Sequence, residues 1–337
     1  MKKILFLAFA LMLSAFTFAQ QQLAILNHNN VITAFYGADA LINAHDQAVN
    51  GDVITLSSGV FNAGNITKAI TIRGAGAWAD STGGATMLRN NFTIDIPQDS
   101  ACLTMEGLYA YNTVYCQRVY NPKFIKCHFQ WIGAQYTNSR MYNASFVNCI
   151  LVHWHSNVSS TYYSSDYNGT QFINSVIMDC NHYGVSDVYV NCVVRQHPEN
   201  TTSRMFQNCV LYFDYARTSA PSNNSSTSYN CLYVQLNTDS ANTSELFTSM
   251  ASHVLWNKRG MNTVFKTFNG STEGENFELL DSIATNCLGT DGTQIGIYGG
   301  AMPFDPHVTS PLIKRINVAN RSTADGKLEV DIEVVNE

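Results

Sequence analysis

Residues Phe146–Leu151 read FVNCIL, and this pattern of an aromatic residue, any residue, Asn, Cys, any residue and an apolar residue decides the fold. Six versions of it occur: FIKCHF at Phe124–Phe129, FVNCIL at Phe146–Leu151, FINSVI at Phe172–Ile177, YVNCVV at Tyr189–Val194, FQNCVL at Phe206–Leu211 and SYNCLY at Ser228–Tyr233. The Cys position recurs at 127, 149, 175 (a Ser), 192, 209 and 231, in steps of 22, 26, 17, 17 and 22 residues. A period of about 20 residues is typical of solenoids, in which each repeat stacks on its neighbour to bury a shared core.

The Asn of each repeat is predicted to turn the chain between two short strands. The aromatic residue and the Cys are three positions apart, and residues three apart on a straight strand point to opposite faces. Asn tolerates left-handed backbone angles, so a bend at Asn lets both side chains point inward. Lys126 is the exception in this column, which otherwise holds Asn148, Asn174, Asn191, Asn208 and Asn230. We expect the stacked Asn side chains to hydrogen-bond from coil to coil.

Further coils are predicted before the first full repeat. Short β-prone runs separated by Gly and Asn occur at Val53–Leu56, Ala69–Ile72, Phe92–Ile96 and Cys102–Met105. The segment Ala38–Gly76 contains ALINAHDQAVNGDVITLSSGVF and then AITIRGAG. This order of helix, Asn-Gly-Asp, strand, Gly-x-aromatic and strand resembles the opening of right-handed parallel β-helix proteins, the pectin-lyase-like superfamily. The resemblance covers about residues 36–305 and implies the fold more specifically than any activity, since one fold hosts many functions.

The resemblance implies an N-terminal helix that caps the open end of the solenoid. The apolar stripe of this helix is predicted to comprise Leu41, Ile42, Ala44, His45, Ala48 and Val49, with His45 as a packed core residue. Asp291–Gly300 (DGTQIGIYGG) is similar to the closing coil of exported bacterial β-helix proteins. We therefore expect an all-β chain with a signal peptide at 1–19, a right-handed parallel β-helix at 20–305 and a C-terminal β cap or tail at 306–337.

The N-terminus and the composition indicate an exported protein. Lys2 and Lys3 precede an apolar run at Ile4–Phe16, and Thr17-Phe18-Ala19 offers a signal-peptidase site. No later segment is apolar enough to span a bilayer, so the mature chain is predicted to lack a transmembrane span. The net charge is −6 and no basic tract occurs, which argues against nucleic acid as a partner. We expect export to the periplasm, cell surface or surroundings of a Gram-negative bacterium.

The nine cysteines would ordinarily suggest disulfides in an exported chain, but most of them fall at one phase of the repeat. Side chains stacked on parallel strands point the same way, which fits the S–S dihedral poorly. We predict a buried ladder of free thiols at Cys127, Cys149, Cys192, Cys209 and Cys231. One or two bridges among Cys102, Cys116, Cys180 and Cys287 stay open as an alternative.

The longest connection between repeats, from Leu151 to Phe172, is the predicted location of a functional site, because long loops on rigid scaffolds often carry function. Four positions past the Cys phase the column runs Trp131, His153, Asp179, Gln196, Phe213 and Gln235. His153 and Asp179 would then lie on adjacent coils with Arg195 nearby. A His-Asp-Arg group can bind an acidic sugar, with His as general base. Ordinary pairing of exposed loop residues is the other interpretation.

Aromatic side chains near this column are candidate sugar-stacking residues, since Trp and Tyr combine an apolar face with a polar handle. The substrate-binding candidates are Trp131, Trp154, His155, Tyr162 and Tyr163. No metal site is predicted: His153-x-His155 lacks a fixed third ligand, and the Asp residues are scattered. No cofactor is expected.

Two functional hypotheses follow. The first is an exported, non-catalytic protein of the cell envelope whose elongated surface faces polysaccharides or other glycans. The alternative is a polysaccharide lyase or glycoside hydrolase acting through the 151–197 face, with His153, Asp179 and Arg195 as acid/base and charge-neutralising groups. The superfamily's lyases carry stacked Asp ligands and its hydrolases carry Asp-Asp pairs, and neither pattern is found in this sequence. The sequence leaves the oligomeric state undetermined.

Overall fold

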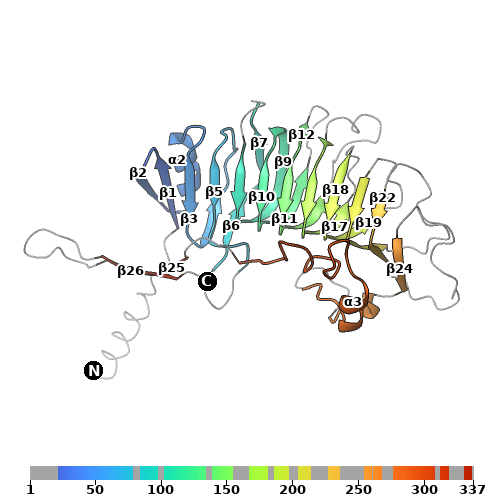
Figure 1. Cartoon of the computed structure of the whole chain (residues 1–337). Coiled ribbons are helices and arrows are strands. Elements are labelled where there is room, and N and C mark those ends of the chain that lie inside the picture. The colour runs from blue at the N-terminus through green and yellow to red at the C-terminus, as the bar shows by residue number, and fades with distance from the viewer. Residues whose placement is uncertain are drawn as a thin grey trace, which may run out of the picture.

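The chain folds as a row of short strands that alternate between two sheets (Figure 1). The computed structural model describes residues 22–78, 84–97, 102–133, 139–154, 167–180, 186–196, 204–213, 227–235, 254–259, 261–267, 276–307, 312–318 and 330–335. Within these residues, sheet A has eleven strands and sheet B has thirteen. From residue 53 to residue 259 each strand of sheet A is followed by one or two strands of sheet B, which is consistent with a parallel β-solenoid.

Sheet A contains the strands that precede the bends. In spatial order they are β2 (Val31–Tyr36), β1 (Leu23–His28), β3 (Val53–Leu56), β5 (Thr71–Arg73), β8 (Thr104–Glu106), β10 (Lys123–Ile125), β13 (Ser145–Val147), β16 (Gln171–Ile173), β18 (Asp187–Val190), β20 (Arg204–Gln207) and β22 (Thr227–Tyr229). From β3 onward every pairing in this sheet is parallel. At its N-terminal end, β1 pairs antiparallel with both β2 and β3.

Sheet B contains the strands that directly follow the bends and, in some coils, a second strand after them; its pairings are parallel. The strands are β4 (Gly59–Asn62), β6 (Thr86–Arg89), β7 (Phe92–Asp95), β9 (Tyr109–Tyr120), β11 (His128–Gly133), β12 (Arg140–Tyr142), β14 (Ile150–Trp154), β15 (Tyr167–Asn168), β17 (Val176–Cys180), β19 (Val193–Gln196), β21 (Val210–Phe213), β23 (Cys231–Gln235) and β24 (Val254–Arg259). The predicted fold class is confirmed at the level of two alternating parallel sheets.

The bend predicted between each aromatic residue and each Cys is confirmed. All six residues of the column have φ between 46° and 57°: Lys126, Asn148, Asn174, Asn191, Asn208 and Asn230. The preceding aromatic rings then stack inside the solenoid, with centroids 4.7 Å apart for Phe124 and Phe146 and 5.0 Å apart for Phe146 and Phe172. The stack continues through Tyr189 and Phe206 at 4.7 and 4.8 Å. One ring per coil therefore builds the core.

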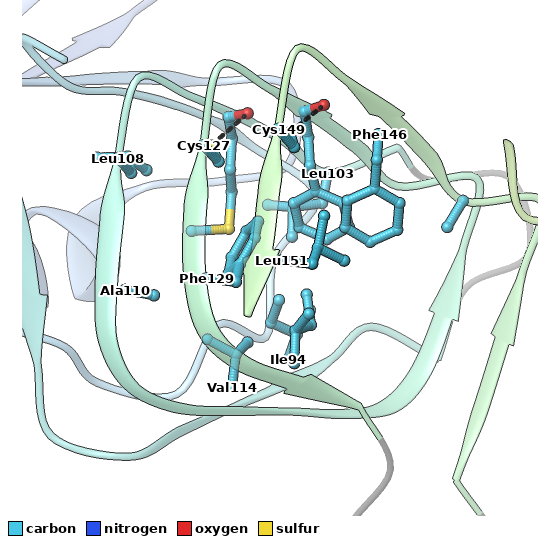
Figure 2. Packing of buried hydrophobic residues seen from close by; sticks show 14 of the residues in the cluster. Ile94, Leu103, Leu108, Ala110, Val114, Cys127, Phe129, Phe146, Cys149 and Leu151 are labelled. Atoms are coloured by element: carbon cyan, nitrogen blue, oxygen red, sulfur yellow. Dashed lines mark hydrogen bonds between the residues drawn. The ribbon is translucent and has the colours of Figure 1, made fainter. Parts of the chain in front are cut away.

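The thiol ladder predicted for the Cys position is also confirmed. The five ladder cysteines are fully buried and form no disulfide, and Cys102, Cys116 and Cys287 form no disulfide either. Figure 2 shows Cys127 and Cys149 on neighbouring coils, above Phe129 and Leu151. The Cys149 thiol lies 3.3 Å from the Phe124 carbonyl oxygen, to which it donates. Ser175 continues the ladder, because its hydroxyl donates to the carbonyl oxygen of Ile173 at 2.9 Å.

The predicted N-terminal helix is present as α2 (Ala40–Gln47), which packs against β1, β2, β3 and β4. Ala40, Leu41 and Ala44 are buried in the core. His45 is buried as predicted, and its Nε2 atom accepts a hydrogen bond from the Thr67 backbone at 3.2 Å. Burial is the largest cause that lowers the pKa of His45. Val49 was predicted to belong to the apolar stripe, but it follows the helix and is half exposed.

The segment Leu288–His307, which we call the strap, differs from the prediction of a closing coil at Asp291–Gly300. It forms no strand, and it follows the 3-10 helix η1 (Met261–Thr263) and helix α3 (Asp281–Asn286). The strap runs back across the coils along the bend column, beneath the strands in Figure 1. Its contacts begin where Asn230 Nδ2 donates to the Leu288 carbonyl oxygen at 3.0 Å. They end where Lys126 Nζ lies 2.8 Å from Asp305 Oδ2.

The strap uses the side chains that were predicted to bond from coil to coil. Asn174 Nδ2 donates to the carbonyl oxygens of Ile297 and Gly299, both at 2.7 Å, and Asn208 Oδ1 accepts from the Thr290 backbone at 2.9 Å. The expected coil-to-coil bond occurs instead at another bend, where Asn143 Nδ2 donates to Asn121 Oδ1 at 3.2 Å.

The strap also covers apolar side chains on the outer face of sheet B. The cluster includes Val176, Val193, Val210 and Leu232 from the sheet, Ile295 and Ile297 from the strap, and Phe265, Leu279 and Ile283 from the segments that precede the strap. In this half of the solenoid sheet B is thus buried on both faces, and its strands read as continuous apolar runs.

After the strap, β25 (Leu312–Val318) and β26 (Val330–Val335) form a separate antiparallel pair, and the role of this pair as a cap or tail stays a prediction. In the described part of the chain no helix is long and apolar enough to cross a membrane.

Candidate functional site

The predicted column of Trp131, His153 and Asp179 lies on the outside of sheet B, at a second corner of each coil. Along β11 and β14 the inward residues are three positions apart, Phe129 with Ile132 and Leu151 with Trp154, and all four are buried. A straight strand would place such residues on opposite faces, so the chain must bend between them. Pairing of β11 with β9 shifts register at this place, between Phe129 and Trp131. The corner turns the intervening side chains outward.

The three side chains of the column contact one another in sequence along the solenoid axis. Trp131 pairs in register with His153, and their ring centroids are 4.0 Å apart with planes tilted by 30°. His153 Nδ1 lies 3.1 Å from Asp179 Oδ2, so the second contact is a hydrogen bond. The side chains of His153 and Asp179 are 29% and 28% exposed. We call these three residues the corner column.

Arg195 lies on β19, the strand that follows Asp179 in sheet B, and its side chain is half-buried. The sequence alignment of the coils placed Gln196 next to Asp179, and this register is wrong. Pairing of β17 with β19 shifts between Ile177 and Cys180, so that Cys180 rather than Asp179 is opposite Gln196. Two residues of β17, Met178 and Asp179, therefore lie opposite the single residue Arg195 of β19.

Trp154 was predicted to bind substrate, and its position contradicts this role. It is fully buried, and its ring packs edge-on against Phe146 at 5.2 Å and Phe172 at 5.5 Å. Because Trp154 is three residues after Leu151, the corner that turns His153 outward turns Trp154 inward. It is a core residue of the aromatic stack. The other predicted substrate-binding residues, His155, Tyr162 and Tyr163, lie outside the described residues.

Sequence reasoning missed a second aromatic group further towards the N-terminus on the outer face of sheet B. His128 stacks on Tyr109 with centroids 4.4 Å apart and on Trp78 with centroids 5.6 Å apart. Trp78 in turn meets Phe304 of the strap edge-on at 6.2 Å. Burial lowers the pKa of His128 to about 4, and its Nε2 atom has no hydrogen-bond partner in the described part of the chain. His128 is therefore a neutral, covered ring at neutral pH.

Lys126 is another contact that the sequence signalled only as an irregularity, since it replaces Asn in the bend column. Its side chain is nearly buried and holds the end of the strap through Asp305 and the carbonyl oxygen of His307. Partial burial of Asp305 opposes its ionisation. The hydrogen bonds from Lys126 and the His307 backbone, together with the Lys126 charge, outweigh this effect and lower the pKa of Asp305.

The corner column offers a flat apolar ring beside groups that donate and accept hydrogen bonds. Nδ1 of His153 faces the carboxylate of Asp179, and Nε2 is the second polar atom of the ring. Asp179 retains further acceptor capacity on its carboxylate. Among the described residues no three His, Cys, Asp or Glu side chains gather closely enough to hold a metal ion. The arrangement is therefore suited to contacts with hydroxyl groups next to an apolar ring face.

No family model matches the chain, and no curated protein matches it.

Proposed function

We propose that this protein is an exported right-handed parallel β-helix protein, related to the pectin-lyase-like superfamily, that binds glycan chains at the bacterial cell envelope without cleaving them. The observation that carries the proposal is the corner column, in which Trp131, His153 and Asp179 contact one another on three successive coils. Successive coils are spaced about 4.8 Å apart, comparable to the length of a sugar residue, so the column can run along a glycan chain.

The chemistry of the column favours a sugar ligand. Sugar rings have an apolar face of C–H groups and a rim of hydroxyls, and an indole ring buries the former while polar neighbours bind the latter. Trp131 supplies the ring and is partly exposed. His153 and Asp179 supply polar groups on side chains that are about 70% covered, which limits the competition from water.

The enzyme hypothesis has one observation in its favour, the hydrogen bond between His153 and Asp179, since a carboxylate can orient an imidazole that acts as a general base. Glycoside hydrolysis, however, commonly needs two carboxyl groups about 5–10 Å apart that flank the scissile bond. The corner column supplies one, and it is engaged by an imidazole. Non-catalytic binding requires no further group, and we place it first.

Export and an envelope location are supported by the positively charged and apolar N-terminal residues and by the low content of charged residues, 13%. The net charge of −6 supports a partner other than nucleic acid. These features agree with a polysaccharide or glycan partner outside the cytoplasm.

The test is affinity electrophoresis of the mature chain in gels that contain polygalacturonate, alginate, xylan or β-glucan. At least one polymer should retard the protein, and Trp131→Ala should weaken binding about tenfold, corresponding to the loss of a stacking contact worth roughly 1 kcal/mol or more. Tyr111→Ala is the matched control, because Tyr111 is 57% exposed on the same sheet outside the column. Equal retardation of both variants and the unmodified chain would place binding elsewhere, and no retardation by any polymer would refute the proposal.

A further inference from the structure

The N-terminal hairpin leaves an open strand edge that is unusual in its composition. Strand β2 is the last strand of sheet A at this end, and nothing in the described residues pairs with its outer side. Its sequence VITAFY holds no charge and no proline, and Val31, Ile32 and Tyr36 are 63%, 59% and 60% exposed. Monomeric proteins usually protect such edges with charged residues, prolines or bulges. The absence of all three points to an edge that is used.

The hydrogen bonds of the hairpin define which backbone groups are open. The closing pair is His28 with Val31, and the Gly37 backbone N–H donates to the Gln22 carbonyl oxygen at 2.9 Å. Pairs that exchange hydrogen bonds alternate with pairs that do not, so the odd-numbered residues of β2 bond to β1. The N–H and C=O groups of Ile32, Ala34 and Tyr36 therefore point away from the hairpin. The side chains of these three residues share one face of the strand, because successive side chains of a strand point to opposite faces.

We propose that the outer edge of β2 is a homodimer interface, in which β2 of a second copy pairs antiparallel with it. A twofold axis makes two identical strands antiparallel, so this pairing satisfies the symmetry of a closed dimer. The outward-facing residues must oppose one another, and the register that pairs all three of them centres the ladder on Ala34 opposite Ala34 of the second copy. Ile32 of each copy then lies opposite Tyr36 of the other copy. The twofold axis makes these two pairs equivalent, and each places a β-branched residue beside an aromatic one.

Charge supports a second copy as the occupant. Each chain carries a net charge of −6, so two copies repel one another over most orientations. The β2 edge is an uncharged strip where this repulsion is least, and it offers no charge to attract a basic or acidic peptide. The small side chain of Ala34 at the axis lets the two backbones approach to the spacing of a sheet, about 4.8 Å.

The test is the molar mass of the mature chain in solution, measured by sedimentation equilibrium at micromolar concentration. The unmodified protein should have the mass of two chains, and Ile32→Lys should halve it, because a lysine on the open edge opposes pairing. Val31→Lys is the matched control. Val31 is equally exposed and adjacent in sequence, but its backbone bonds to β1 and its side chain is on the opposite face, so the dimer should persist. A single-chain mass for the unmodified protein, or equal masses for both variants, overturns the proposal.

A second measurement tests the register without a charged substitution. In a Cys102→Ser background, which removes an exposed thiol, Ala34→Cys should form a disulfide-linked dimer on mild oxidation, because each Cys would be opposite its counterpart. Thr33→Cys should cross-link far less, since Thr33 would be opposite Phe35 of the second copy. Cross-linking of neither variant, or equal cross-linking of both, rules out the proposed ladder.

Discussion

The imidazole of His153 and the carboxylate of Asp179 meet at 3.1 Å although they are 26 residues apart in sequence, because each occupies the same corner of successive coils. The contact is a consequence of the solenoid: whichever residues fall at one phase of the repeat become neighbours on the surface. Trp131 extends the row by one coil at 4.0 Å. A binding surface can therefore be built from one residue per coil, and the length of the row sets the length of ligand it can contact.

The strap's hydrogen bonds to the bend column lead to a stability prediction. Asn174→Ala should lower the free energy of unfolding by about 3 kcal/mol, of which about 1 kcal/mol is the cost of a left-handed backbone without Asn and the rest is two lost hydrogen bonds. Asn148→Ala is the matched control: its φ is 53°, against 46° for Asn174, and its side-chain oxygen has no hydrogen-bond partner in the described residues. Urea denaturation should show a loss of only about 1 kcal/mol for the control. Equal losses would show that the strap contributes nothing through this column.

The covered ring of His128 predicts a loss of stability in mild acid. Burial lowers the pKa of His128 from 6.5 to about 4. As the pH falls from 6.5 towards 4, the unfolded chain takes up a proton that the folded chain does not bind, so the free energy of unfolding decreases within this window. The loss should reach about 2 kcal/mol at about pH 4.5.

His128→Phe isolates this effect, since it keeps a ring between Trp78 and Tyr109 but cannot be protonated. Chemical denaturation of both proteins at neutral pH and at about pH 4.5 should give the variant a smaller loss by about 2 kcal/mol. The same loss in both proteins would assign the acid sensitivity to other groups.

The thiol ladder predicts selective chemical reactivity. Burial raises the pKa of Cys116 to about 12 and raises the pKa values of Cys149, Cys209 and Cys231 well above the usual range. Thiolate is the reactive form, so these thiols should resist iodoacetamide in the folded protein and react after denaturation. Cys102 is exposed and should be alkylated first. Peptide mapping by mass spectrometry provides the readout, Cys102→Ser is the control, and rapid native labelling of Cys149 or Cys209 would contradict a closed core.

Much of the fold could be predicted from sequence because its determinants are local. Asn148 and its equivalents are needed wherever the backbone becomes left-handed, and an aromatic ring two residues earlier fills the core at the same phase. The same logic identified Trp131, His153 and Asp179 as a column. It misassigned Trp154, because the second corner carries no Asn or Gly to mark it, and a bend there exchanges the inward and outward faces.

The strap could not be predicted for a different reason. Its contacts with the bend column join residues more than 50 positions apart, such as Asn174 with Ile297 and Lys126 with Asp305, and no periodicity links them. The only local sign was Lys126 itself, a lysine in a column of asparagines. Likewise, the register shift that sets Arg195 opposite both Met178 and Asp179 depends on how β17 meets β19 rather than on the repeat length.

The most direct test of the proposed function is to recover the glycan after prolonged incubation with the mature protein and to measure its chain length and its ends by mass spectrometry. We expect the protein to retain the polymer and to release it with unchanged length, no new reducing ends and no unsaturated residues. Shortened or unsaturated products that disappear with His153→Ala would contradict this expectation and would establish the corner column as a catalytic site.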